Sequence, residues 1–199
     1  MYSVLLKKLF LGFALICATG VEAKQSTLLD ELSWALQTHI DKAPAGAEIE
    51  VGFSPEGGAE RLVLKVINAS RKSIRLAAYA FTSPAIVRAL RDARQRGVDV
   101  RVVADDEANQ SKSGTAALNL LAGAKIPVRL NSAYAIHHDK YIIADGLHVQ
   151  TGSYNYSQAA AKSNSENVIV IWHNPELAAS YLRHWQSRFD EGTAFKPNY

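Results

Sequence analysis

Apolar and polar positions along the chain alternate between two periods, which predicts strands separated by helices. Runs of β-branched and aliphatic residues typical of strands occupy residues 49–53, 73–81, 98–105, 126–130 and 166–172. Apolar residues at helical spacing occupy residues 57–70, 83–97, 114–124, 156–161 and 175–190. This order predicts a single-domain α/β fold with a mixed, mostly parallel sheet and helices on both faces.

A β-hairpin is expected from residues 138–145 and 148–151. Side chains two apart in a strand share a face, so His138 and Lys140 are expected to point the same way and His137 the opposite way. We therefore interpret His137 as a rim or packing residue.

The first residues have the pattern of a cleaved signal peptide. Lys7 and Lys8 precede an apolar stretch that is too short to span a membrane, and VEA precedes Lys24. We expect residues 1–23 to be removed and the mature protein to be periplasmic or secreted. Residues 24–48 are interpreted as an N-terminal arm or helix, and residues 49–199 as the domain that carries the candidate catalytic residues described below.

Composition adds two limits to this picture. Cleavage after residue 23 removes the single cysteine, which excludes disulfides and thiol chemistry from the mature chain. It also leaves 20 basic against 18 acidic residues. This weakly positive balance is compatible with a nucleic-acid partner but does not require one.

The most specific feature is a set of residues at fixed offsets within residues 138–155. The pattern His-x-Lys-x4-Asp-x6-Gly-Ser-x-Asn is formed by His138, Lys140, Asp145, Gly152, Ser153 and Asn155. At an average residue frequency of roughly 5–7%, five such offsets match by chance about once per million histidines. Coincidence is therefore a poor explanation.

This pattern resembles the HKD motif of the phospholipase D superfamily, and the short chain with one copy of it resembles the small bacterial periplasmic endonucleases of that superfamily. The resemblance implies a phospholipase D-like fold and hydrolysis of DNA, and also of RNA, without a metal or other cofactor. It also implies a phosphohistidine intermediate on His138.

The residue types suit that chemistry. A histidine can act as nucleophile near neutral pH, and the Lys140 ammonium and Asn155 amide can stabilise charge on phosphate oxygens. Gly152 and Ser153 are candidates for contact with the bound anion, through close backbone approach and a hydroxyl or amide donor. Asp145 would face away from His138 along a regular strand, so we expect it to fix the turn at Gly146.

Glu166 begins the apolar run 166–172, where a carboxylate is unusual. The resemblance implies that such a glutamate accepts a hydrogen bond from the catalytic histidine, and Glu166 is the position that fits. An exposed carboxylate at the end of a strand remains the alternative.

The single motif predicts a shared active site. Two histidines are needed, one to attack phosphorus and one to protonate the leaving oxygen, and no other histidine has a lysine two residues on. We therefore expect a homodimer with the two copies of His138 across its axis.

Several alternatives stay open from the sequence. A phospholipase D that hydrolyses or transfers phosphatidyl groups is the main competitor, although no long amphipathic segment suggests a bilayer surface. A binding module for nucleic acid or membranes is a second. A metal site made by His137, His138 and Asp145 is disfavoured, because adjacent strand residues point to opposite faces. Loops 53–58 and 105–114, the latter with Lys112, are further candidates for the lining of the site.

Overall fold

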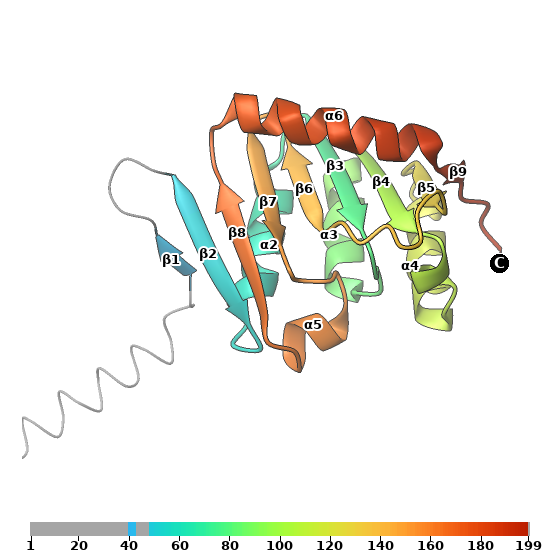
Figure 1. The fold of residues 1–199 in the computed structure, drawn as a ribbon, viewed down its shortest axis with the longest axis horizontal. Coiled ribbons are helices and arrows are strands. Elements are labelled where there is room, and N and C mark those ends of the chain that lie inside the picture. The colour runs from blue at the N-terminus through green and yellow to red at the C-terminus, as the bar shows by residue number, and fades with distance from the viewer. Residues whose placement is uncertain (1–39, 43–47, 199) are drawn as a thin grey trace, which may run out of the picture. The chain divides into compact units, whose positions relative to one another are not determined.

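The computed structural model describes residues 40–42 and 48–198, which form one nine-stranded sheet with helices on both faces (Figure 1). The strands are β1 (Ile40–Lys42), β2 (Ile49–Ser54), β3 (Ser73–Ala78), β4 (Asp99–Asp105), β5 (Val128–Asn131), β6 (Tyr141–Ala144), β7 (His148–Gly152), β8 (Glu166–Ile171) and β9 (Thr193–Ala194). The helices are α2 (Gly58–Ala69), α3 (Pro84–Gln95), α4 (Lys112–Gly123), α5 (Gln158–Lys162) and α6 (Pro175–Glu191), and η1 (Glu107–Asn109) is one turn of 3-10 helix. The predicted α/β class, with a mixed sheet and helices on both faces, is confirmed.

The strand order is β1-β2-β8-β7-β6-β3-β4-β5-β9. Within the described sheet, only β3–β4 and β4–β5 are parallel neighbours, so the expectation of a mostly parallel sheet is wrong. β2 does run in the same direction as β3, as the helix between them predicts. However, β8, β7 and β6 lie between these two strands, and each pairs antiparallel with its neighbours. The position of these three strands results from pairing between segments that are distant in the sequence, and local periodicity does not reveal such pairing.

The core has one layer on each side of the sheet. Alternate strand residues such as Leu76 and Val102 pack with α2, α3 and α4, whereas Ala77 and Val103 pack under α6 with Trp185. Figure 1 shows α6 crossing one face of the sheet while α2, α3 and α4 cover the other. Because the strands are covered on both faces, they are close to continuously apolar.

Helix starts follow signals in the sequence. Ser83 caps α3 by accepting a hydrogen bond from the N–H of Ile86, and Asn174 caps α6 in the same way. A proline follows each cap at the first helical position, where its missing N–H is not needed. Each cap satisfies an N–H group of the first helical turn that has no partner within the helix.

One part of the sheet is not covered by α6. The contacts of α6 run over β7, β6, β3, β4 and β5. On the same face, Val51, Ile169 and Ile171 are half-buried and Phe53 is 44% exposed. Their neighbours Val168 and Val170 point to the opposite face and are buried there. The β2–β8 end of the sheet therefore presents an apolar face that the described residues leave open.

Two expected segments differ in the structure. Ile40–Lys42 form an edge strand on β2 rather than part of an arm or helix, whereas the predicted signal peptide lies outside the described residues. The strand predicted from residue 138 begins at Tyr141, so His138 and Lys140 belong to an irregular segment before β6. Other predicted strands and helices agree to within a few residues.

Candidate active site

The histidine and lysine of the motif lie together at the edge of the sheet where β3 and β4 end. The exposed ring of His138 packs against the ring of Tyr79, with 4.6 Å between centroids. The Lys140 ammonium lies 5.2 Å from the centroid of the same tyrosine ring and donates to the backbone oxygen of His138 at 2.8 Å. His138 and Lys140 are therefore on one side, as predicted, although by loop geometry rather than by strand alternation.

Lys140 is buried, with 7% of its surface exposed. Burial lowers the pKa of its ammonium, and the charges of Asp139 and Glu166 oppose that effect. A partly desolvated cation beside an exposed imidazole can act strongly on a phosphate, because little water screens it.

The neighbours of His138 anchor the irregular segment that carries it. His137 is 2% exposed, and its backbone N–H donates to the buried carboxylate of Asp105 at 2.7 Å. Asp139 accepts a hydrogen bond from His184 of α6 at 2.9 Å. His137 is thus a buried packing residue.

Asn155 follows β7, at the same edge of the sheet. Its side-chain Oδ1 is buried and has no hydrogen-bond partner among the described residues. A buried polar atom without a partner is uncommon in folded proteins and is found more often at sites that bind a ligand. The contact of its amide group with a phosphate stays a prediction.

Glycine is required at position 152 for a reason other than the expected contact with an anion. Its φ is 151°, and a Cβ at this position would lie 2.2 Å from the backbone oxygen of Asn167 in β8. The close approach that requires glycine is therefore between β7 and β8, not between the backbone and an anion. This contact sets where the chain leaves β7 on its way to Asn155.

Glu166 and Ser153 form a network of their own. The Ser153 hydroxyl donates to Glu166 at 2.6 Å, and the Asn164 amide donates to the other carboxylate oxygen at 2.9 Å. Ser153 also accepts from the backbone N–H of Asn167 at 3.1 Å. Within the described residues the carboxylate makes no hydrogen bond to His138, so the expected pairing is not found in the single chain. Its charge acts instead on Lys140.

Asp145 lies at the other end of β6. Its carboxylate accepts the backbone N–H groups of Arg71, Lys72 and Ser73 at 2.7–3.1 Å. It is five positions along the chain from Lys140, a distance of about 16 Å along extended backbone. Asp145 therefore joins two turns at the far edge of the sheet, in line with the supporting role expected for it, and the structure does not bring it to His138.

Sequence reasoning did not find Tyr79, and it named Asp105 and Asn109 only as part of the candidate loop 105–114. Tyr79 contacts both His138 and Lys140, Asp105 holds the segment before His138, and the buried Asn109 amide donates to the backbone oxygens of both Tyr79 and Asp105. The available signal was their place after apolar strands, where polar residues gather at the edge of an open sheet.

The two predicted loops differ in their relation to the site. Residues 105–114 end β4 and form η1 and the start of α4; Asp105 and Asn109 of this loop contact the segments around His138, whereas Lys112 is exposed. In the other loop, α2 begins directly after Gly57, and the backbone of Gly58 lies against Gly52. Among the described residues, no group of three or more His, Cys, Asp or Glu side chains is arranged to hold a metal ion, and no helix is long and apolar enough to cross a membrane.

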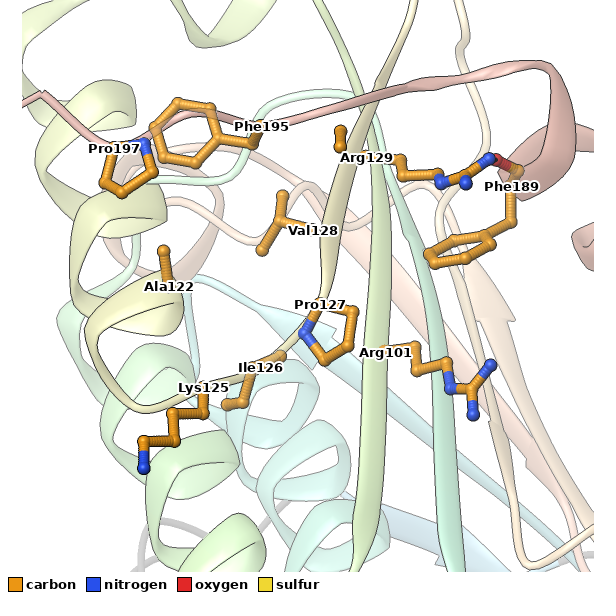
Figure 2. Close-up of a pocket in the computed structure, with 11 residues that line it drawn as sticks. Arg101, Ala122, Lys125, Ile126, Pro127, Val128, Arg129, Phe189, Phe195 and Pro197 are labelled. Carbon is orange, nitrogen blue, oxygen red and sulfur yellow. The ribbon is translucent and has the colours of Figure 1, made fainter.

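A cavity of about 500 Å³ lies away from the catalytic residues, around the start of β5 (Figure 2). Figure 2 shows its lining side chains on both sides of that strand, with Phe195 and Pro197 from the C-terminal segment. Its Arg129 is held by the backbone oxygens of Phe189, Asp190 and Gly192, and Arg101 pairs with Asp99. No residue of the motif lines this cavity.

The fold and the site define a class of phosphodiesterase, and comparison with known proteins identifies the family. Residues 63–189 match the family model described as "Cardiolipin synthase, PLD-like domain". The chain belongs to the phospholipase D superfamily and is an enzyme of that superfamily.

Its relatives carry several names. The chain is 39% identical to "Phospholipase D" of Rickettsia bellii over 71% of this chain and 69% of the relative. It is 32% identical to the mouse "Mitochondrial cardiolipin hydrolase" over 76% of this chain and 66% of the relative. The solved structure of Nuc, a phospholipase D family member from Salmonella typhimurium, is 47% identical with a TM-score of 0.74, over 74% of this chain and 97% of that one.

Proposed function

We propose that this enzyme is an endonuclease that hydrolyses DNA, with RNA as a second substrate, and that it needs no divalent metal. The observation that carries the proposal is the pairing of an exposed His138 with the buried Lys140 ammonium at the edge of an open sheet. An exposed nucleophile is accessible to a bulky polymer, and the ammonium supplies charge stabilisation that a metal supplies in other nucleases. The 47% identity with Nuc over 97% of that chain supports the choice of the nuclease branch.

The reaction proceeds in two displacements. A ring nitrogen of His138 attacks phosphorus, the bond to the leaving oxygen breaks, and a second, protonated histidine gives that oxygen its proton. Water then attacks the phosphohistidine, the second histidine takes a proton from the water, and the phosphomonoester leaves with His138 restored. Lys140 and the Asn155 amide stabilise the charge on the non-bridging oxygens in both steps.

We propose that the second histidine is His138 of another copy of the chain. The open apolar face formed by Val51, Phe53, Ile169 and Ile171 supports this assembly, because an exposed patch of this kind is favourably buried between subunits. One end of this patch lies at the edge of the sheet that carries the active site, because Phe53 pairs with Asn167, next to Glu166. A two-fold axis beside this edge would bring the two histidines together while covering both open faces.

Plasmid cleavage in EDTA tests the metal-free nuclease. Purified mature protein is expected to nick supercoiled DNA equally well with EDTA and with Mg²⁺, and His138→Asn is expected to abolish nicking in both. Loss of wild-type cleavage in EDTA, with recovery on adding Mg²⁺, would refute the metal-free mechanism.

Subunit mixing tests the shared site. Wild-type chains are co-refolded with a ninefold excess of His138→Asn chains, so that most wild-type chains pair with an inactive partner. We expect activity per wild-type chain to fall about tenfold, since a site with two histidines forms only in the wild-type pair. Unchanged activity per wild-type chain, or a monomer in sedimentation, would contradict the proposal.

A phospholipase D activity is the second candidate, and the names of the relatives favour it. Plasmid DNA and phosphatidylcholine vesicles are given in parallel to one preparation, with His138→Asn as the control for both. Release of choline at a rate far above DNA cleavage would reverse the order of the two candidates.

We also propose that the mature enzyme is periplasmic or secreted. The charged start and short apolar stretch of residues 1–23 support cleavage of this segment. N-terminal sequencing of the protein from a periplasmic fraction is expected to begin at Lys24. Recovery of the intact chain only from the cytoplasm would contradict this.

A further inference from the structure

A buried carboxylate lies next to the segment that carries the catalytic histidine. Asp105 ends β4 and is 3% exposed. One carboxylate oxygen accepts the N–H of His137 at 2.7 Å, and the other accepts the N–H of Ala108 at 2.8 Å. A buried charge is costly unless its hydrogen bonds are made, so both donors are strongly held.

This bond acts where the chain has no other regular support. Residues 132–140 contain neither helix nor strand. The residue whose N–H is held, His137, immediately precedes His138. The backbone around His138 is therefore held by side chains rather than by a sheet ladder: Asp105 holds it before His138, Lys140 bonds to the His138 oxygen, and Asp139 bonds to His184.

The ring of His138 is contacted by Tyr79, and Asn109 holds that tyrosine in place. Asn109 is 2% exposed, and its amide nitrogen donates at 2.7 Å to the backbone oxygens of both Tyr79 and Asp105. Its amide oxygen accepts the N–H of Phe81 at 2.8 Å. The tyrosine held in this way packs its ring against His138.

We propose that Asp105, together with Asn109 and Tyr79, positions His138 for attack on phosphorus. Asp105 fixes the backbone before the nucleophile, Tyr79 limits the rotation of its ring, and Asn109 joins the ends of β3 and β4 that carry these two residues. None of the three transfers a proton or forms a bond to substrate in this role. The inference rests on the proposed role of His138 but not on whether the substrate is DNA or a phospholipid.

Bis(p-nitrophenyl) phosphate, a small phosphodiester, is a suitable probe because its binding requires few contacts away from phosphorus. Asp105→Asn keeps the shape of the side chain, but its single oxygen can accept only one of the two N–H groups well. We expect kcat per folded chain to fall about 10- to 100-fold, with KM within about threefold of wild type, because a misplaced nucleophile slows the chemical step. Tyr79→Leu is expected to lower kcat in the same way.

The matched control is Asp145→Asn, which removes another carboxylate that binds backbone N–H groups, at the far edge of the sheet. All variants are assayed at a temperature where their unfolding curves show them folded. Asp145→Asn is expected to lose stability but to keep wild-type kcat, which separates positioning from general destabilisation.

Wild-type kcat in folded Asp105→Asn would overturn the inference, and so would an equal fall in kcat for Asp145→Asn. If Asp105→Asn does not fold, the kcat of Tyr79→Leu is the test, and a wild-type kcat in that variant overturns the inference. Failure of the proposed role of His138 is distinguished by the wild-type protein, which would then cleave the probe no faster than His138→Asn.

Discussion

Asp145→Asn tests whether the aspartate of the motif is structural. Asp145 has a φ of 58°, a left-handed conformation that asparagine adopts as readily as aspartate. The substitution therefore adds no backbone strain and changes only the carboxylate. That carboxylate accepts N–H groups from Arg71, Lys72 and Ser73.

The expected loss of stability follows from these bonds. A hydrogen bond to a charged group contributes about 1.5–3 kcal/mol, and an asparagine oxygen keeps part of the set, so we expect a loss of about 2–4 kcal/mol. For a domain of this size that corresponds to a fall in Tm of about 5–15 °C. Urea unfolding followed by circular dichroism measures it, with wild type as the reference.

The same substitution predicts a pH dependence. Burial raises the pKa of Asp145, but the backbone N–H groups of Ser73, Lys72 and Arg71, together with the charge of His148, lower it more strongly, and the net pKa is below its usual value. A carboxyl with a lowered pKa in the folded state stabilises the fold above its unfolded pKa of about 3.9, and this contribution is lost as pH falls through the folded pKa. The stability difference between wild type and Asp145→Asn is therefore expected to be full at pH 7 and to shrink below about pH 4.

Activity provides the decisive measurement. At a temperature where both proteins are folded, we expect the same kcat on plasmid DNA or bis(p-nitrophenyl) phosphate, because Asp145 is about 16 Å along the chain from Lys140. A tenfold fall in kcat in folded Asp145→Asn would refute the structural role, and so would a change in stability below about 0.5 kcal/mol, a size typical of unimportant surface positions.

Three further predictions concern the site itself. Lys140→Met keeps the length of a buried side chain but removes its charge, so we expect kcat to fall about 10²–10³-fold with little change in the unfolding curve; a fall below threefold would contradict its role. Gly152→Ala places a Cβ against the backbone of Asn167, so we expect a loss of about 1–3 kcal/mol in urea unfolding, and wild-type stability would contradict the close approach. Glu166→Gln removes a charge that keeps the pKa of Lys140 from falling further, so the variant is expected to have a lower Lys140 pKa. Lys140 then loses its proton at lower pH, and the alkaline limb of the profile of kcat/KM against pH is expected to move to lower pH. A shift to higher pH would count against this.

Local patterns in the sequence were sufficient for most secondary structure. Ser83 with Pro84, and Asn174 with Pro175, mark the starts of α3 and α6, because a cap and a proline act within one helical turn. The offsets of the motif were also sufficient to group His138 and Lys140. They are two residues apart, and a short segment can bring such neighbours to one side even outside a strand.

Contacts between distant segments were not predictable in this way. Glu166 was expected to bind His138, but in the described chain it binds Ser153 and Asn164. Gly152 was assigned to an anion, but its small size is required by β8. In both cases the residue type indicated an important position but did not identify the residue that it contacts. The contacts depend on which strands become neighbours in the fold.

The sequence by itself determined the order of strands and helices, the catalytic motif and its single occurrence in the chain. These features depend on periodicity and on spacing over a few residues, which a chain carries before it folds. Only the tertiary structure decided that β6, β7 and β8 lie between β2 and β3, and that Asp105 and Tyr79 converge on His138 from the ends of β4 and β3. Such convergence depends on the combined burial and pairing of segments more than thirty residues apart, and no local pattern contains that information.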